Sequence, residues 1–133
     1  MVFWLYQMAV MWFKPEAYRK MVWEGKRTTW TAGKIATKKR PAPGDRMVLW
    51  FAKAGNEEPG IYGWGVILKY NAHSNKVDFR PAPPSDFLKM YPLCDDEVER
   101  TIGKIRKVPR GTMWLVEEEY AKVLRKKIHN WAK

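Results

Sequence analysis

Residues 30–50 place tryptophans and cationic side chains close together along the chain. Trp30 and Trp50 stand on either side of a segment that is rich in lysine and poor in large apolar residues. Its cations are Lys34, Lys38, Lys39 and Arg40. Indole rings stack on unpaired bases, worth roughly 1–3 kcal/mol per base, and lysine and arginine bind phosphates. The spacing therefore favours a site for a base and its phosphate backbone, while core tryptophans beside a solvated loop are the alternative.

The composition agrees with a polyanionic partner. The chain has 133 residues and eight tryptophans, and its 25 Lys plus Arg exceed its 14 Asp plus Glu, for a net charge of +11. Because a buried indole needs a hydrogen-bond partner, a core uses tryptophan sparingly. The charge and an isoelectric point of about 9.8 favour nucleic acid or an anionic surface.

Few residues are suited to catalysis. The sequence has no glycine-rich phosphate loop, no Gly-x-Ser-x-Gly elbow and no His-Glu-x-x-His pair. Cys94 is the only cysteine, and His73 and His129 are the only histidines, so we expect no disulfide, metal site or cofactor. No apolar run is long enough to span a membrane, and a cytoplasmic protein without catalytic activity is expected.

The segment at residues 44–67 organises the expected sheet. Two apolar and aromatic runs flank a loop of Gly, Asn, Glu and Pro, which predicts a β-hairpin. Glycines at 60, 63 and 65 indicate a bulge or a close approach of two backbones. Further strands are expected at residues 2–7, 27–31, 76–79 and 113–116, and residues 104–109 are compatible with another. Prolines at 81, 83 and 84 argue against a central strand there.

Helical signals fall between and after these strands. Residues 15–25 begin with Pro and end with Gly, residues 85–90 follow a capping Ser, and residues 95–97 form an acidic first turn. Apolar residues at spacings of three and four predict an amphipathic helix at residues 117–131. Residues 1–133 are thus expected to form one α+β domain.

Several motifs resemble the EVE domain of the PUA-like superfamily, a relative of the YTH domain. They are residues 3–7 (FWLYQ), 24–30 (EGKRTTW), 44–50 (GDRMVLW), 59–67 (PGIYGWGVI), 106–112 (RKVPRGT) and 116–120 (VEEEY). The motifs follow the family's order over nearly the whole chain. The segment at residues 31–40 (TAGKIATKKR) departs from the common bacterial form, and Gln7 and the Leu49-Trp50 pair look closer to restriction-associated versions.

The resemblance implies a small mixed β-barrel of five to six strands with flanking helices and an aromatic pocket for a modified base. On this basis the pocket would contain Trp30, Trp50, Trp4, Tyr6 and Gln7. The backbone contacts would come from Lys34, Lys38, Lys39, Arg40 and Lys53. Methylated or hydroxymethylated cytosine, flipped out of DNA, is the expected ligand, with DNA favoured over RNA. An effector domain or protein of a restriction or defence system is the implied partner.

Two other functions remain open. Residues 25–28 (GKRT) look like the Gly-x-Lys-Thr turn of the ASCH family, which includes small nucleases and amidohydrolases, with Lys and Arg exchanged. However, residues 60–67 carry no carboxylate that would complete an acid/base set. A basic RNA-binding adaptor whose tryptophans are all structural is the second alternative, and it would bind without base preference.

Overall fold

A curled six-stranded sheet and two helices make up the described part of the chain. The computed structural model describes residues 2–8, 28–35, 37–51, 60–82, 94–106 and 112–132. The sheet has the order β2-β5-β4-β3-β1-β6. Its strands are β1 (Phe3–Met8), β2 (Thr28–Thr31), β3 (Arg46–Phe51), β4 (Gly60–Asn71), β5 (Lys76–Ala82) and β6 (Met113–Val116). The helices are α2 (Asp96–Ile105) and α3 (Glu118–Ala132).

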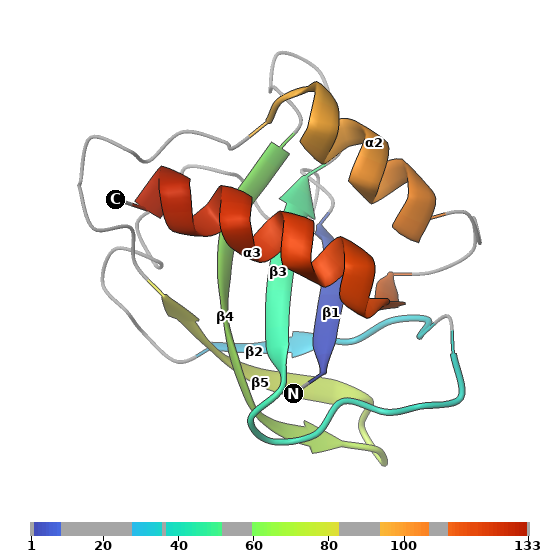
Figure 1. Ribbon diagram of the computed structural model, residues 1–133. Coiled ribbons are helices and arrows are strands. Elements are labelled where there is room, and N and C mark those ends of the chain that lie inside the picture. Colours follow the sequence, from blue (N-terminus) through green and yellow to red (C-terminus); the bar gives the residue numbers. More distant parts are fainter. Residues whose placement is uncertain are drawn as a thin grey trace.

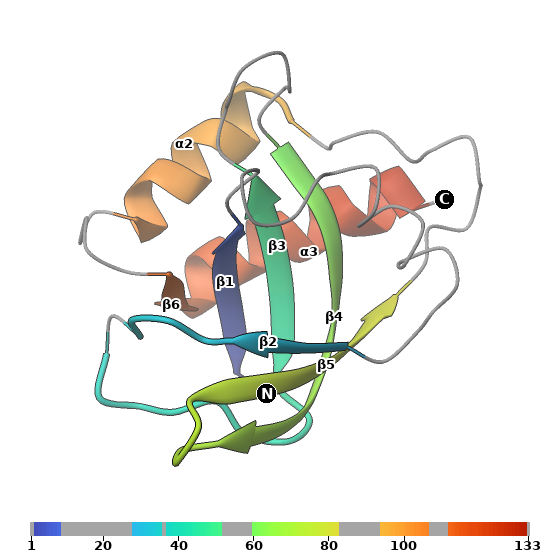
Figure 2. The same ribbon diagram turned by 180° about the vertical axis from the view of Figure 1, so that it is seen from behind.

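The sheet is mixed and closes partway into a barrel. β1 and β3 are parallel, and the other neighbouring strands are antiparallel. The helices α2 and α3 lie on one face of β1, β3 and β4, and β2 and β5 cross the other face (Figures 1 and 2). An isolated parallel bridge joins Ile35 to Met113 of β6. The expected α+β class and PUA-like half-barrel with flanking helices are confirmed.

Two apolar cores lie on the two faces of the sheet, because successive side chains of a strand point to opposite sides. The inner core lies inside the curl and includes Tyr6, Leu49 and Phe79. The outer core lies between the sheet and the helices and includes Leu5 and Leu124. The face that a strand residue occupies therefore decides which core it joins.

The predicted hairpin at residues 44–67 is present. Gly44 has a φ of +91°, a conformation that few other residues adopt, just before β3. The pairing of β3 with β4 shifts between Leu49 and Trp50, as expected for a bulge. At Gly65 a Cβ atom would lie 2.1 Å from the carbonyl oxygen of Arg80. The glycine therefore allows β4 to approach β5, which confirms the predicted close approach.

The expected strand at residues 104–109 is wrong for its first two residues, which belong to α2. Asp95 caps this helix by accepting a hydrogen bond from the Val98 backbone N at 2.8 Å. Val98, Ile102 and Ile105 are buried at spacings of four and three. This helical spacing continues through Ile105 and outweighs the local strand signal.

The expected end of a strand at residue 79 is also wrong, because β5 continues through Pro81 to Ala82. β2 pairs with β5 only as far as Phe79, so in the described pairing Pro81 has β4 alone beside it. A proline is tolerated where a strand has one free side, since no ladder bond is lost there. The helices expected at residues 15–25 and 85–90 lie outside the described residues.

Candidate functional site

Trp30 and Tyr6 lie together inside the curl. The ring centroid of Trp30 is 5.9 Å from that of Tyr6 and 5.5 Å from that of Phe79. The Tyr6 hydroxyl donates to the backbone oxygen of Thr31 at 2.7 Å, and burial raises the pKa of Tyr6 to about 12. Trp30 is partly buried against the inner core. These aromatic rings join β1 to β2 and β5 across the curl.

Trp4 belongs to the same inner core and has 0% of its surface exposed. Its Nε1 donates to the Asp45 Oδ2 at 3.0 Å. The same oxygen accepts from the backbone N of Ala42 at 3.0 Å. Trp4 therefore attaches β1 to the chain at residues 42–45, which follows the cationic segment at residues 34–40. Its side chain presents no surface to a ligand in this arrangement.

Gln7 and Trp50 lie on the other face of the sheet. Trp50 is 5% exposed and packs in the outer core with Leu5 and Val48. Gln7 is the register partner of Trp50 on the parallel strands β1 and β3, close to the strand ends. The structure thus brings Gln7 beside Trp50 and Tyr6 beside Trp30, but it sets these two pairs on opposite faces.

Three buried polar atoms have no hydrogen-bond partner in the described part of the chain. They are Gln7 Oε1, Trp50 Nε1 and Arg106 Nε. A buried polar group without a partner costs about 1–3 kcal/mol, so native proteins rarely leave one unless something else satisfies it. The carbonyl oxygen and the two N–H groups together offer one acceptor and two donors.

Arg106, the third of these residues, lies at the end of α2. It follows the last residue of α2, and its guanidinium lies 5.6 Å from the ring centroid of Trp114 in β6. Burial lowers the pKa of Arg106 from its ordinary value. Sequence reasoning did not name Arg106 as a candidate, because it read residues 104–109 as compatible with a strand. The end of an amphipathic helix capped at Asp95 could have identified it.

The predicted cationic loop is exposed and well anchored. Lys34, Lys38, Lys39 and Arg40 are all exposed. Arg40 Nη1 donates to the backbone oxygen of Thr37 at 2.6 Å. The backbone oxygen of Lys34 accepts from Thr112 N at 2.8 Å, beside the start of β6. Lys53, the fifth predicted backbone contact, lies outside the described residues.

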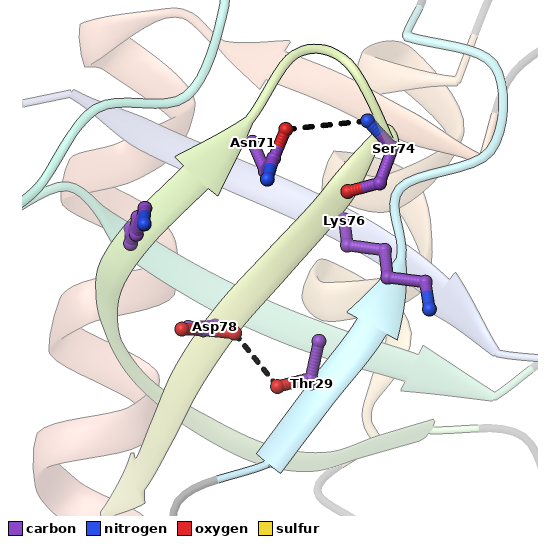
Figure 3. A pocket seen from close by; sticks show the side chains of 6 residues that line it. Thr29, Asn71, Ser74, Lys76 and Asp78 are labelled. Atoms are coloured by element: carbon purple, nitrogen blue, oxygen red, sulfur yellow. Dashed lines mark hydrogen bonds between the residues drawn. The ribbon is translucent and has the colours of Figure 1, made fainter.

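A small polar pocket lies next to this loop, on β2 and the β4–β5 hairpin (Figure 3). It has a volume of about 150 Å³ and is lined by Thr29, Lys69, Asn71, Ser74, Lys76 and Asp78. Asp78 accepts a 2.7 Å hydrogen bond from the Thr29 hydroxyl across the pocket (Figure 3). The hairpin turn is fixed to the loop, since Asn75 Nδ2 donates to the Gly33 oxygen at 2.7 Å. Lys69 and Lys76 therefore extend the cationic surface of the loop.

Metal-ligand clusters and membrane-spanning helices are absent from the described residues. No three His, Cys, Asp or Glu side chains of the described ranges gather as metal ligands. Neither α2 nor α3 is long and apolar enough to cross a membrane. Cys94 is exposed. The Gly-x-Lys-Thr-like turn at residues 25–28 falls almost entirely outside the described residues.

The fold is shared with solved structures. No family model matches the chain, and no curated protein is similar to it in sequence. A protein from Leishmania major aligns over 98% of this chain and 96% of its own, with a TM-score of 0.62 and 16% identity. A protein from Rhodopseudomonas palustris aligns over 98% and 94%, with a TM-score of 0.60 and 18% identity.

Human THYN1, solved in complex with DNA that contains 5-methylcytosine, aligns over 100% of this chain and 99% of its own. Its TM-score is 0.59 and its identity 14%. At such identities the likeness concerns the fold alone.

Proposed function

We propose that this protein is a nucleic-acid-binding module that recognises a modified base in DNA. The observation that carries the proposal is the pair of unpartnered buried atoms, Gln7 Oε1 and Trp50 Nε1, on neighbouring strand ends. A bound base would satisfy both atoms. The shared fold with human THYN1, whose structure contains 5-methylcytosine DNA, supports a DNA ligand.

The hydrogen-bond inventory favours a pyrimidine. The pairing edges of cytosine and thymine each offer one donor and two acceptors, which complements one acceptor on Gln7 and donors on Trp50 and Arg106. Guanine offers the opposite count, and adenine has only one of each. A 5-methyl or 5-hydroxymethyl group would add apolar or polar contact beside the outer core. Methylated or hydroxymethylated cytosine is therefore the proposed ligand, flipped out of the helix.

The cationic loop supplies the affinity that does not depend on sequence. Lysine and arginine neutralise phosphates and release counterions, and this positions the strand without selecting a base. Lys34, Lys38, Lys39 and Arg40 would make these contacts beside Lys69 and Lys76. The likeness to restriction-associated versions supports an effector of a restriction or defence system as partner, acting in the cytoplasm.

The proposed pocket differs from the one expected from sequence. Trp50 and Gln7 form its core, with Arg106 as an addition. Trp4 and Tyr6 already donate to Asp45 and Thr31, and Trp30 packs against Tyr6 and Phe79, so we assign these three a structural role. Trp50→Phe and Gln7→Met are then the informative variants, since each keeps apolar volume and removes the polar atom.

Fluorescence anisotropy with labelled oligonucleotides tests the proposal. The probes carry 5-methylcytosine, 5-hydroxymethylcytosine, cytosine, thymine or N6-methyladenine at one position. We expect a modified cytosine to bind most tightly, and Trp50→Phe to reduce its preference over N6-methyladenine about two- to tenfold, the value of one neutral hydrogen bond to the pairing edge. Trp30→Phe is the matched control on the opposite face and should keep the preference.

The unfolding free energies of the variants provide a second check. Since Trp50 Nε1 and Gln7 Oε1 have no partner among the described residues, their removal should not destabilise the free protein. Equal affinity of the wild type for every probe, with steep salt dependence, would instead identify a basic adaptor without a base pocket. Cleavage or hydrolysis of a probe would favour the ASCH-like alternative.

A further inference from the structure

A second cavity lies between α3 and the sheet, away from the Gln7–Trp50 pair. It has a volume of about 360 Å³, within the range of small-ligand sites. Its lining residues are Phe3, Arg46, Met47, Trp64, Gly65, Arg125, Ile128 and His129. Phe3 and Arg46 begin the parallel strands β1 and β3, whereas Gln7 and Trp50 lie four residues further along. At about 3.3 Å per residue, the two sites are about 13 Å apart along these strands.

The lining combines an aromatic ring with cations. Trp64 is partly buried against the outer core, and Arg46 and Arg125 extend from β3 and α3. No carboxylate lines this cavity, whereas the other two described cavities contain Asp78 or Glu97. Among these three, it alone has an aromatic wall and cations without a carboxylate in its lining.

Arg125 retains donors for a ligand. Its Nη2 binds Glu118 Oε1 at 2.6 Å, and the side chain is 44% exposed. A guanidinium has five N–H donors, so this one contact leaves others for a phosphate. Arginine also matches the geometry of phosphate oxygens through two parallel hydrogen bonds.

The rest of the exposed face of α3 reinforces the positive potential. Lys122 and Lys126 are four residues apart, and both are exposed. Like charges at this spacing destabilise a helix unless an anion compensates them. α3 crosses β1, β3 and β4 on the face that contains the cavity (Figure 1). A bound anion would therefore relieve repulsion along the helix.

We propose that this cavity binds one nucleotide unit, with its phosphate between Arg46 and Arg125 and its base against Trp64. The unit is either a free nucleoside monophosphate or one nucleotide of a DNA strand, since the two share the same chemistry. The proposal stands apart from the proposed base pocket, because it uses other residues at the other end of the strands.

Isothermal titration with deoxyadenosine monophosphate tests the site, with deoxyadenosine and 2-deoxyribose 5-phosphate as partial ligands. We expect the complete nucleotide to bind more tightly than either part. Arg46→Gln and Arg125→Gln should each weaken it about tenfold, as expected for the loss of a charge-assisted hydrogen bond. Trp64→Phe, which keeps an aromatic ring in the outer core, should weaken the nucleotide and the nucleoside alike.

Arg100→Gln is the matched control, because Arg100 is an exposed arginine of α2 that lines none of the described cavities. The proposal is overturned if Arg100→Gln weakens nucleotide binding as much as Arg46→Gln does. It is also overturned if the wild type does not bind the nucleotide at millimolar concentration and Arg46→Gln leaves oligonucleotide binding unchanged. If Arg46→Gln binds a single-stranded oligonucleotide more weakly than the wild type, the nucleotide unit in the cavity belongs to a DNA strand. Binding of the free nucleotide alone identifies the monophosphate.

Trp50→Phe separates this site from the base pocket. If nucleotide binding persists in Trp50→Phe while preference for modified cytosine falls, both proposals are supported. If the wild type lacks that preference but Arg46→Gln still weakens nucleotide binding, only the base pocket fails.

Discussion

The buried bond between Trp4 and Asp45 allows a sharp test of how the inner core is held. Trp4 Nε1 and the backbone N of Ala42 both donate to Asp45 Oδ2, each at 3.0 Å. Asp45→Ala removes this acceptor and leaves the indole N–H in a core where Trp4 has 0% exposure. Water cannot replace the lost partner without entering the core.

The expected loss of stability in Asp45→Ala follows from these two hydrogen bonds. A buried donor left unsatisfied costs about 1–3 kcal/mol, and the partly buried Ala42 N–H adds a smaller loss. We therefore expect Asp45→Ala to lower the free energy of unfolding by about 2–4 kcal/mol. Asp45→Asn keeps one side-chain oxygen that can accept both bonds, so its cost should stay below about 1.5 kcal/mol.

Urea unfolding followed by far-ultraviolet circular dichroism measures these changes. The double-mutant cycle adds Trp4→Phe, which removes the donor. Because no indole N–H is then left unpaired, Asp45→Ala should cost about 1–3 kcal/mol less in that background. Equal costs in the two backgrounds, or an Asp45→Asn variant as unstable as Asp45→Ala, would refute the reasoning.

Four further outcomes are expected. Gly65→Ala should destabilise the protein by at least about 1–3 kcal/mol, since its Cβ would meet the Arg80 oxygen at 2.1 Å. Gly103→Ala, at an open helical position, should stabilise it by up to about 1 kcal/mol in the same urea assay. Burial raises the pKa of Tyr6 to about 12 in the folded protein, against an ordinary value of 10. The contribution of this pKa difference to the free energy of unfolding is therefore full below pH 10 and is lost between pH 10 and 12. Ultraviolet titration of tyrosinate in wild type and Tyr6→Phe checks this, and a Tyr6 that titrates near 10 contradicts it. Lys38→Gln and Lys39→Gln should each reduce the slope of log affinity for DNA against log salt by about 1, and an unchanged slope would remove these lysines from the interface.

Much of the fold could be predicted because its signals are local. The hairpin at residues 44–67 is encoded by two apolar runs, a Gly-Asp turn and strand glycines. The terminal helix is encoded by apolar spacing and by acids at its start, where they favour the helix dipole. The errors at residues 104–109 and at Pro81 arose where tertiary context decided. Burial of Ile102 and Ile105 continued α2 to residue 105, and among the described residues β2 pairs with β5 only as far as Phe79, short of Pro81.

The proposed site shares Gln7, Trp50 and the loop cations with the site expected from sequence. The exposed cations of residues 34–40 follow from a loop composition that contains little apolar surface. Gln7 and Trp50 were both named from sequence, but so were Trp30, Trp4 and Tyr6, which share a different core. Nothing in the local sequence distinguishes a tryptophan of the inner core from one of the outer core.

The sequence by itself determined the kinds of elements, their order, the strong positive charge and the abundance of indole rings. Tertiary structure decided which face each described ring occupies, and that Gln7, Trp50 and Arg106 each bury a polar atom without a partner among the described residues. The physical reason is that side chains alternate between faces, so one shift of register or one bulge, such as that at Leu49 and Trp50, reassigns a residue. Strand pairing between distant segments fixes that register, and no local pattern contains it.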